Sequence, residues 1–154
     1  MASMEKTFMM IKPDGVQRGL IGRIIQRLED RGMKICAMKL IQVTPKQAKE
    51  HYKEHEGKEF YEPLLKYIMS GPVVAMVVEG RDCVDQIRKL AGKTDPKDAQ
   101  PGTIRYDFGQ NISRNVVHAA DGNESAKREI GIYFDDDAEI VEYGLDIHKW
   151  MFGE

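Results

Sequence analysis

The sequence predicts an α+β fold in which helices pack on one face of a mostly antiparallel sheet, with a split βαβ order of elements. Two observations predict this class. Short apolar runs of strand length alternate with segments of helical periodicity, in the order β-α-β-α-α-β-α-loop-β-α. The chain has 154 residues, of which 42% are hydrophobic, and this is enough to build one sizeable core. We therefore expect a single domain over residues 1–154.

The first half of the chain begins with a strand and a helix. Residues 7–11 form a short apolar run, and the turn-forming residues 13–15 end it. Leucine and isoleucine then recur at helical spacing over residues 20–28. Residues 34–43 alternate as a second strand, and a threonine-proline pair starts a polar helix over 46–55.

The middle of the chain holds the strongest strand pattern. Residues 73–78 are a nearly continuous run rich in valine, which predicts a central strand covered on at least one face. A helix over 61–69 precedes this run, and an amphipathic helix over 82–90 follows it.

The last third contains a long segment with little periodicity. Residues 92–114 include two prolines and three glycines, and a loop of that length inside a compact domain is usually functional. A strand at 116–118 and a helix at 124–133 follow. Three aspartates at 135–137 predict a solvated helix start, and residues 150–154 could join an interface or pack on their own subunit.

Composition narrows the class of partner. The formal net charge of −2 gives no basic footprint for nucleic acid, which favours a small charged ligand. Residues 1–6 lack the layout of a secretory signal, and no apolar run approaches the roughly 20 residues that cross a bilayer. We expect a cytoplasmic protein without membrane contact. Cys36 and Cys83 have no CxxC partner and suit buried, reduced thiols.

The segment around His118 is the most informative one for chemistry. The apolar pair before His118 delivers the imidazole at a strand end, beside the small residues Ala119 and Ala120. Neutral imidazole is available near pH 7 and can act as a nucleophile without a separate base. From this segment alone, a satisfied core histidine remains the alternative.

Cations and hydroxyls that could bind phosphate are scattered along the chain. Lys12 stands at the end of the first strand, directly before a rigid turn. Guanidinium groups form bidentate hydrogen bonds with phosphate oxygens, and hydroxyl groups donate hydrogen bonds to phosphate oxygens without adding charge. The further candidates are Tyr52, Arg88, Thr94 and Arg105. Each taken singly could be a solvated surface group, and the sequence has no GxxxxGK[ST] phosphate loop.

A metal site within the protein is not indicated. His51 and His55 have the i, i+4 spacing that could hold zinc, but the segment lacks the HExxH glutamate and an evident third ligand. The aspartates at 135–137 more often form a helix start than a cation site.

Four separated motifs, in order along nearly the whole chain, resemble those of the nucleoside diphosphate kinases. They are Lys12 to Gly19, Ser70 to Val73, Pro101 to Arg105, and Asn115 to Ala126. The resemblance implies a ferredoxin-like βαββαβ sandwich with a four-stranded antiparallel sheet. It also implies an enzyme that transfers the γ-phosphoryl group of a nucleoside triphosphate, such as ATP, to a nucleoside diphosphate by a ping-pong route.

The resemblance assigns roles to individual residues of this sequence. His118 matches the histidine that becomes phosphorylated, and Glu129 matches the carboxylate that bonds its other ring nitrogen. Lys12 and Asn115 match residues that meet the ribose and its 3′-hydroxyl, and Lys12 also lies near the transferred group. Phe60 matches the aromatic that stacks on the base, which explains broad base specificity. Matches to phosphate-binding positions are Tyr52, Arg88, Thr94 and Arg105.

The resemblance further implies a magnesium ion held through nucleotide phosphates and water rather than by protein ligands. It implies a homo-oligomer, with a hexamer favoured and a tetramer possible. A nucleotide-responsive scaffold or nucleic-acid-binding regulator is the alternative function, and the near-neutral charge argues against strong nucleic-acid binding.

One position departs from the family pattern. The family usually has a serine at position 120 whose hydroxyl helps to hold the glutamate, and this chain has Ala120. We expect Glu129 to have one partner fewer, at a cost on the order of 1 kcal/mol of local organisation, with the chemistry retained.

Overall fold

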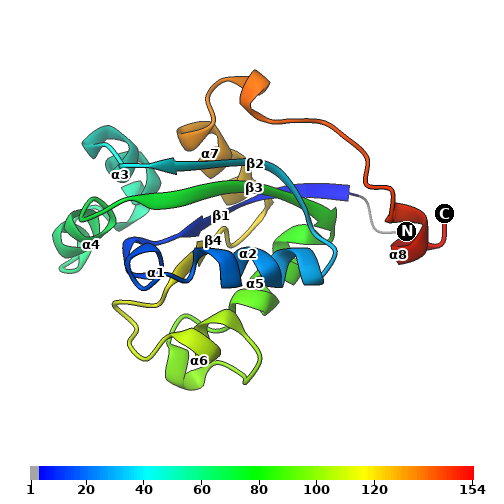
Figure 1. The fold of residues 1–154 in the computed structure, drawn as a ribbon. Coiled ribbons are helices and arrows are strands. Elements are labelled where there is room, and N and C mark those ends of the chain that lie inside the picture. Colours follow the sequence, from blue (N-terminus) through cyan, green and yellow to red (C-terminus); the bar gives the residue numbers. More distant parts are fainter. Residues whose placement is uncertain (1–3) are drawn as a thin grey trace.

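The computed structural model describes residues 4–154 and contains a four-stranded antiparallel sheet with the strand order β2-β3-β1-β4 (Figure 1). The strands are β1 (Met4–Ile11), β2 (Lys34–Ile41), β3 (Val73–Arg81) and β4 (Val117–Ala119). The sheet confirms the expected α+β class. Residues 1–3, half of the segment compared with a secretory signal, lie outside the described residues.

Strand β1 is central to the sheet and buries both of its faces. Met10 of β1 lies opposite Ala75 of β3 on one side and opposite His118 of β4 on the other. Phe8 and Met10 belong to one core cluster, whereas Met9 and Ile11 belong to the other. This alternation follows from the two-residue period of a strand and means that both faces must be covered.

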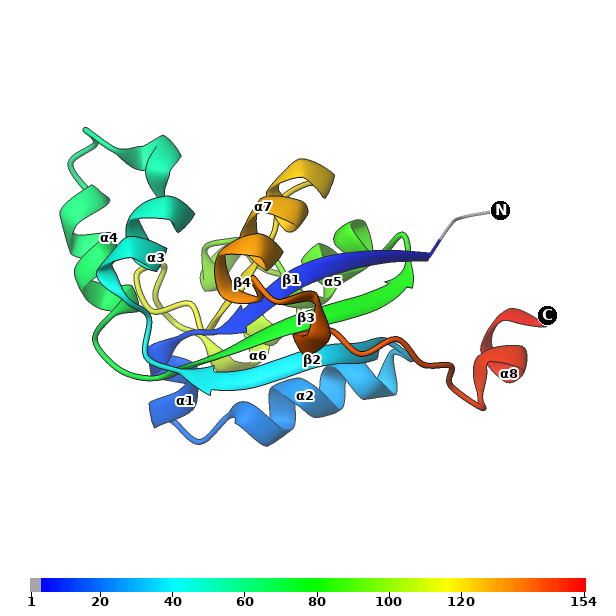
Figure 2. The same ribbon diagram turned by 90° about the horizontal axis from the view of Figure 1, so that it is seen from above.

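Helices cover both faces of the sheet (Figures 1 and 2). Helices α2 (Ile21–Asp30) and α5 (Cys83–Ala91) pack on one face, and α3 (Pro45–His51), α4 (Tyr61–Ile68) and α7 (Asn123–Tyr133) pack on the other. The expectation of helices on one face was therefore wrong. The apolar run of β3 is buried on both sides, as in sheets that are covered by two layers.

Several elements are shorter or more structured than expected. The turn at Pro13 opens a short helix, α1 (Pro13–Gln17), and the helix expected over 46–55 stops at His51 before a 3₁₀ turn, η1 (Lys53–His55). The long segment 92–114 holds η2 (Pro96–Asp98) and α6 (Ile104–Phe108). Thr103 caps α6, because its hydroxyl accepts the Tyr106 N–H at 3.2 Å.

The chain after α7 runs past the outer edge of β2 to a terminal helix. Asp136 caps η3 (Asp137–Glu139), which confirms the expected helix start. Val141 N donates to Cys36 O at 2.8 Å, and helix α8 (His148–Phe152) then turns Met151 towards Gly32.

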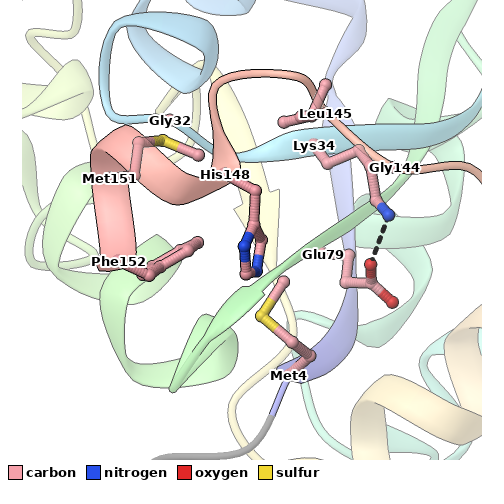
Figure 3. A pocket seen from close by; sticks show the side chains of 9 residues that line it. All are labelled: Met4, Gly32, Lys34, Glu79, Gly144, Leu145, His148, Met151 and Phe152. Atoms are coloured by element: carbon pink, nitrogen blue, oxygen red, sulfur yellow. Dashed lines mark ion pairs between the residues drawn. The ribbon is translucent and has the colours of Figure 1, made fainter. Parts of the chain in front are cut away.

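A small cavity of about 80 Å³ lies between α8 and the sheet (Figure 3). Its floor carries the ion pair of Lys34 and Glu79, with 2.7 Å between Nζ and Oε1. Trp150 is 81% exposed, whereas Phe152 packs on Arg81, whose guanidinium carbon lies 4.2 Å from the centroid of the ring.

The two cysteines are buried free thiols, as expected. Cys36 belongs to the core cluster on one face of the sheet, and Cys83 belongs to the cluster on the other face. Within residues 4–154, none of the helices is long and apolar enough to span a bilayer.

Candidate active site

A strained turn at Val116 positions His118 in the site. Val116 has a φ of 76°, and Val117 N donates to Asn115 O across it at 2.8 Å, which defines a γ-turn of the rare positive-φ form. We expected a strand over 116–118, but β4 begins only after this turn. A β-branched residue in that conformation is strained and persists only where its surroundings hold it.

The end of β1 and the start of α1 hold the turn. Lys12 N donates to Val116 O at 2.9 Å, and Val116 N donates to Asp14 Oδ2 at 3.0 Å. Gly15 lies so close that an added Cβ would be 2.7 Å from Ile11 Cγ2 and 3.0 Å from Val116 O. The turn residues 13–15 therefore fix the backbone that carries His118.

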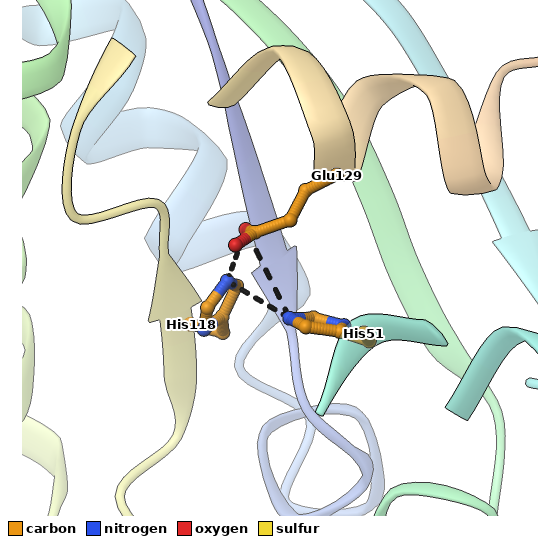
Figure 4. A group of neighbouring side chains, drawn as sticks. All are labelled: His51, His118 and Glu129. Atoms are coloured by element: carbon orange, nitrogen blue, oxygen red, sulfur yellow. Dashed lines mark hydrogen bonds and ion pairs between the residues drawn. The ribbon is translucent and has the colours of Figure 1, made fainter. Parts of the chain in front are cut away.

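Glu129 on α7 contacts the ring of His118 directly (Figure 4). The distance from His118 Nε2 to Glu129 Oε1 is 2.5 Å, and Glu129 is buried. Because Nε2 is engaged in this way, Nδ1 is the ring nitrogen left to attack a substrate. Burial, followed by the charges of Lys12 and Arg105, lowers the pKa of His118 to about 3, so the imidazole is neutral near pH 7.

His51 is a further contact that the sequence patterns did not reveal. Its Nε2 lies 3.1 Å from His118 Nε2, and its Nδ1 lies 2.7 Å from Tyr133 Oη. The only sequence signal was its spacing with His55, which suggested a zinc site. The two histidines separate, because His51 is buried against His118 whereas His55 packs against Phe60, with 5.1 Å between ring centroids.

His51, His118 and Glu129 have the residue types of a metal site, with their nearest ligand atoms all within 4.8 Å of one another. The separation of 2.5 Å between His118 and Glu129 is that of a hydrogen bond. A tetrahedral zinc ion with bonds of about 2.0–2.1 Å needs wider separations between its ligand atoms. The group is therefore a hydrogen-bonded cluster.

His118 lines a cavity of about 310 Å³, together with all of the phosphate-binding residues predicted from the sequence. Lys12, Arg88 and Arg105 bring three cations to its wall. Lys12 is buried, and burial together with Arg105 lowers its pKa to about 8. Tyr52, Thr94 and Asn115 also line the cavity, from the segments that follow α3, follow α5 and precede β4, respectively.

Two buried polar atoms at this cavity lack a hydrogen-bond partner within residues 4–154. They are Tyr52 Oη and Arg105 Nε. The other guanidinium nitrogens of Arg105 are engaged, since Nη1 donates to Gly92 O at 2.7 Å and Nη2 donates to Val117 O at 2.8 Å. Buried donors without partners are costly, so these two side chains carry an unfavourable contribution at the cavity wall.

Phe60 lines a second, more apolar cavity of about 470 Å³ that shares Lys12, Thr94 and Asn115 with the first. Phe60 is 50% exposed and Ile112 is 55% exposed, so both side chains present apolar surface at this cavity. Phe60 was predicted from the sequence, whereas Ile112 was not, because a single isoleucine in a loop follows no recognisable pattern.

Ala120 is buried in a small apolar cluster with Val84 and Ala126. Glu129 has a weak second partner in Arg128, whose Nη2 lies 3.7 Å from Oε2. Arg128 in turn donates from Nη1 to Glu50 O at 3.0 Å, which ties α7 to α3.

Comparisons with known proteins point to a single family. A sequence model of the family described as nucleoside diphosphate kinase matches residues 5–139. A nucleoside diphosphate kinase of Pelotomaculum thermopropionicum is 53% identical over 97% of this chain and 99% of its own length. One of Archaeoglobus fulgidus is 53% identical over 98% of this chain and 99% of its own length.

Among solved structures, a halophilic nucleoside diphosphate kinase from Halobacterium salinarum in complex with CDP superposes with a TM-score of 0.94. It is 47% identical, and the match covers 97% of this chain and 99% of that one.

Proposed function

The chain belongs to the nucleoside diphosphate kinase family, and we propose that His118 is the group that carries the phosphoryl between its two nucleotides. The enzyme transfers the γ-phosphoryl group of a nucleoside triphosphate to a nucleoside diphosphate. The observation that carries the proposal is the engagement of His118 Nε2 by Glu129 at 2.5 Å, with the neutral ring facing the cationic cavity.

In the first half of the ping-pong reaction, His118 Nδ1 attacks the γ-phosphorus of a triphosphate such as ATP. The N–P bond forms as the bond from phosphorus to the β,γ-bridging oxygen breaks, and that oxygen keeps the electron pair in the departing diphosphate. The second half is the reverse with another nucleotide, so the acceptor diphosphate takes the phosphoryl group. Glu129 accepts the Nε2–H and steadies the positive charge that builds on the ring.

The cations neutralise charge on the phosphates and position the transferred group. These two effects account for most of the catalysis of phosphoryl transfer by a protein. Arg88 and Arg105 are suited to non-bridging phosphate oxygens, and Lys12 is suited to the transferred group. Tyr52 and Thr94 line the same cavity and complete the proposed set of phosphate-binding side chains.

The sugar and base fit the adjoining cavity. Lys12 and Asn115 line both cavities and suit the ribose with its 3′-hydroxyl. Phe60 and Ile112 offer apolar surface on which any base can stack, and stacking discriminates little among bases. Broad nucleotide specificity follows, and the CDP bound by the Halobacterium enzyme supports a nucleotide at this site.

Magnesium would enter with the nucleotide. It keeps several waters and takes few protein ligands, so phosphate oxygens and water would hold most of its coordination sphere. Glu54 and Asp121 line the same cavity and offer carboxylate oxygens, the kind of ligand that would suit the ion. When bound, it neutralises charge on the phosphate chain.

We further propose a cytoplasmic homo-oligomer, with a hexamer favoured over a tetramer. Met38 and Leu40 on the outer strand β2 are 51% and 64% exposed, and an exposed apolar edge strand favours association. Light scattering of the purified chain tests the oligomeric state.

The test of the function is direct. Incubation with ATP and magnesium should give an acid-labile, alkali-stable phosphoprotein that passes its phosphate to GDP. His118→Ala should abolish both steps, and His148→Gln, in the remote helix α8, should retain them. Transfer that persists in His118→Ala would refute the mechanism.

A further inference from the structure

His51 is buried against the proposed nucleophile, yet the reaction as described gives it no role. It is the last residue of α3 and is 2% exposed. One ring nitrogen faces His118 and the other faces Tyr133, as the distances of 3.1 Å and 2.7 Å show. Figure 4 shows the three side chains converging from α3, β4 and α7.

The position of the ring proton on His118 restricts which tautomer His51 can adopt. His118 must carry its proton on Nε2 for Glu129 to accept it and for Nδ1 to attack. His51 Nε2 faces the same atom, so a proton on it would oppose the proton of His118. Glu129 Oε1 would not accept such a proton, because it lies 3.8 Å from His51 Nε2, which is beyond hydrogen-bond range.

The arrangement that satisfies every contact has the His51 proton on Nδ1. Nδ1–H then donates to Tyr133 Oη, and the bare Nε2 of His51 accepts from His118. Tyr133 is itself fixed, because its ring stacks on Phe8 with 4.9 Å between centroids and an interplanar angle of 13°.

Packing also immobilises the His51 ring. The Tyr52 ring stacks on the His51 ring, with 4.4 Å between centroids and an interplanar angle of 11°. The Phe8 ring packs edge-on against the His51 ring, with 6.1 Å between centroids. His51 in turn meets the His118 ring edge-on at 4.5 Å and 73°. A ring held in this way closes the Nε2 side of His118 and opposes its rotation.

We propose that His51 is a positioning residue for His118, sharing the Nε2 proton with Glu129 while Tyr133 holds His51 in the accepting tautomer. The inference rests on the proposed role of His118 as the phosphoryl carrier. Acting through the nucleophile rather than on the substrate, His51 keeps Nδ1 unprotonated and aimed into the cavity. Its loss should therefore slow phosphorylation without weakening nucleotide binding.

The experiment compares His51→Leu, which cannot accept a hydrogen bond, with His51→Gln, whose amide oxygen can. Tyr133→Phe keeps the aromatic ring but removes the partner of His51 Nδ1, and His148→Gln controls for loss of a remote histidine. We would measure the single-turnover rate of phosphoenzyme formation, the nucleotide dissociation constant, and the ¹⁵N shifts of the His118 ring.

His51→Leu should slow phosphorylation about ten- to a hundred-fold, which is typical when a supporting partner of a reactive group is lost. The nucleotide dissociation constant should stay within about twofold, His51→Gln should recover part of the rate, and Tyr133→Phe should fall between them. The ¹⁵N shifts should show His118 moving towards a tautomer mixture in His51→Leu.

An unchanged rate and unchanged ring shifts in His51→Leu would overturn the proposal. So would equal slowing in the leucine and glutamine variants with a matching rise in the dissociation constant, since that indicates a structural role only. If neither His51 variant folds, wild-type rate and shifts in Tyr133→Phe would overturn it. Failure of the proposed function itself appears separately, as phosphoryl transfer that survives in His118→Ala.

Discussion

Lys12 and Asn115 are 103 residues apart in the chain, yet Lys12 Nζ donates to Asn115 Oδ1 at 2.9 Å in the wall shared by the two cavities. Asn115 Nδ2 donates onward to Thr94 O at 3.0 Å. The partner of the buried ammonium is thus a neutral amide, which orients the cation without cancelling its charge. That charge stays available for a phosphate or a hydroxyl of the nucleotide.

Asn115→Asp tests this arrangement with almost no change in shape. A carboxylate in place of the amide would neutralise Lys12 and repel phosphate, so kcat/KM should fall about ten- to a hundred-fold, corresponding to roughly 1.4–2.8 kcal/mol. Steady-state kinetics with ATP and GDP would measure the fall. A double-mutant cycle with Lys12→Gln should show a coupling of about 0.5–3 kcal/mol. Additive effects of the two changes would contradict a direct interaction between them.

The rate of phosphoenzyme formation should decline as the pH falls through about 7. Burial raises the pKa of Glu129 to about 7, whereas His118 stays neutral down to about pH 3. Protonation of Glu129 removes the carboxylate that accepts the His118 Nε2–H and that stabilises the positive charge on the ring, and this lowers the rate.

Glu129→Gln, assayed with excess magnesium from pH 5 to 8, separates the two groups. The variant should be slower throughout but should lack the decline near pH 7. A decline that persists in Glu129→Gln would assign it to another group.

The sequence patterns predicted much of this fold, for reasons that lie in local chemistry. The apolar run at 73–78 and the isoleucine-rich repeat at 20–28 each specify an element from neighbouring residues alone. The sequence patterns did not predict features that tertiary contacts determine. The second helical layer appears only when both faces of β1 are seen to be buried, and the turn at Val116 needs the bonds from Lys12 and Asp14.

The same distinction between local patterns and tertiary contacts applies to the residues of the site. Arg88 and Arg105 are cations without a distinguishing local pattern, whereas Lys12 stands before a rigid turn. Only the family resemblance assigned the three cations to one site before the structure placed them around one cavity. His51 was noticed for its spacing with His55, but its contact with His118 spans 67 residues and has no local signal. Residues that act through a neighbour in space need the fold to be identified.

Phe60→Ala should weaken binding of all nucleotides by a similar amount. Loss of one stacking aromatic is worth about 1–3 kcal/mol per base, and stacking discriminates little among bases. Dissociation constants for ADP, GDP, CDP and UDP would measure the change. Tyr106→Ala is the matched control, since Tyr106 is 47% exposed and lines neither cavity. A loss confined to one base would show that edge contacts, rather than stacking, hold the base.

Ala120→Ser should leave turnover equal or better. The new hydroxyl would lie among Val84 and Ala126, where burial without a partner is unfavourable, so it must find Glu129 to be tolerated. Turnover and thermal unfolding would be measured together. A large fall in either would show that the apolar cluster around position 120 excludes a hydroxyl.

Gly15→Ala should destabilise the fold and slow the reaction together. The added Cβ would press on Ile11 and on the carbonyl of Val116, a residue whose φ of 76° is already strained. Overpacking of this kind costs typically about 1–3 kcal/mol, to be measured by urea unfolding. Because Val116 leads directly into β4, displacement of its carbonyl should also move His118 and reduce the phosphorylation rate.

Gly22→Ala is the internal control for that change. Gly22 lies in α2 with open space around its added Cβ, so alanine should be neutral or stabilise the helix by up to about 1 kcal/mol without affecting the rate. If Gly15→Ala loses stability but keeps the full phosphorylation rate, the γ-turn does not transmit strain to His118. If both variants behave alike, the close approach at Gly15 has no energetic importance, and the strained turn is held by the bonds from Lys12 and Asp14 alone.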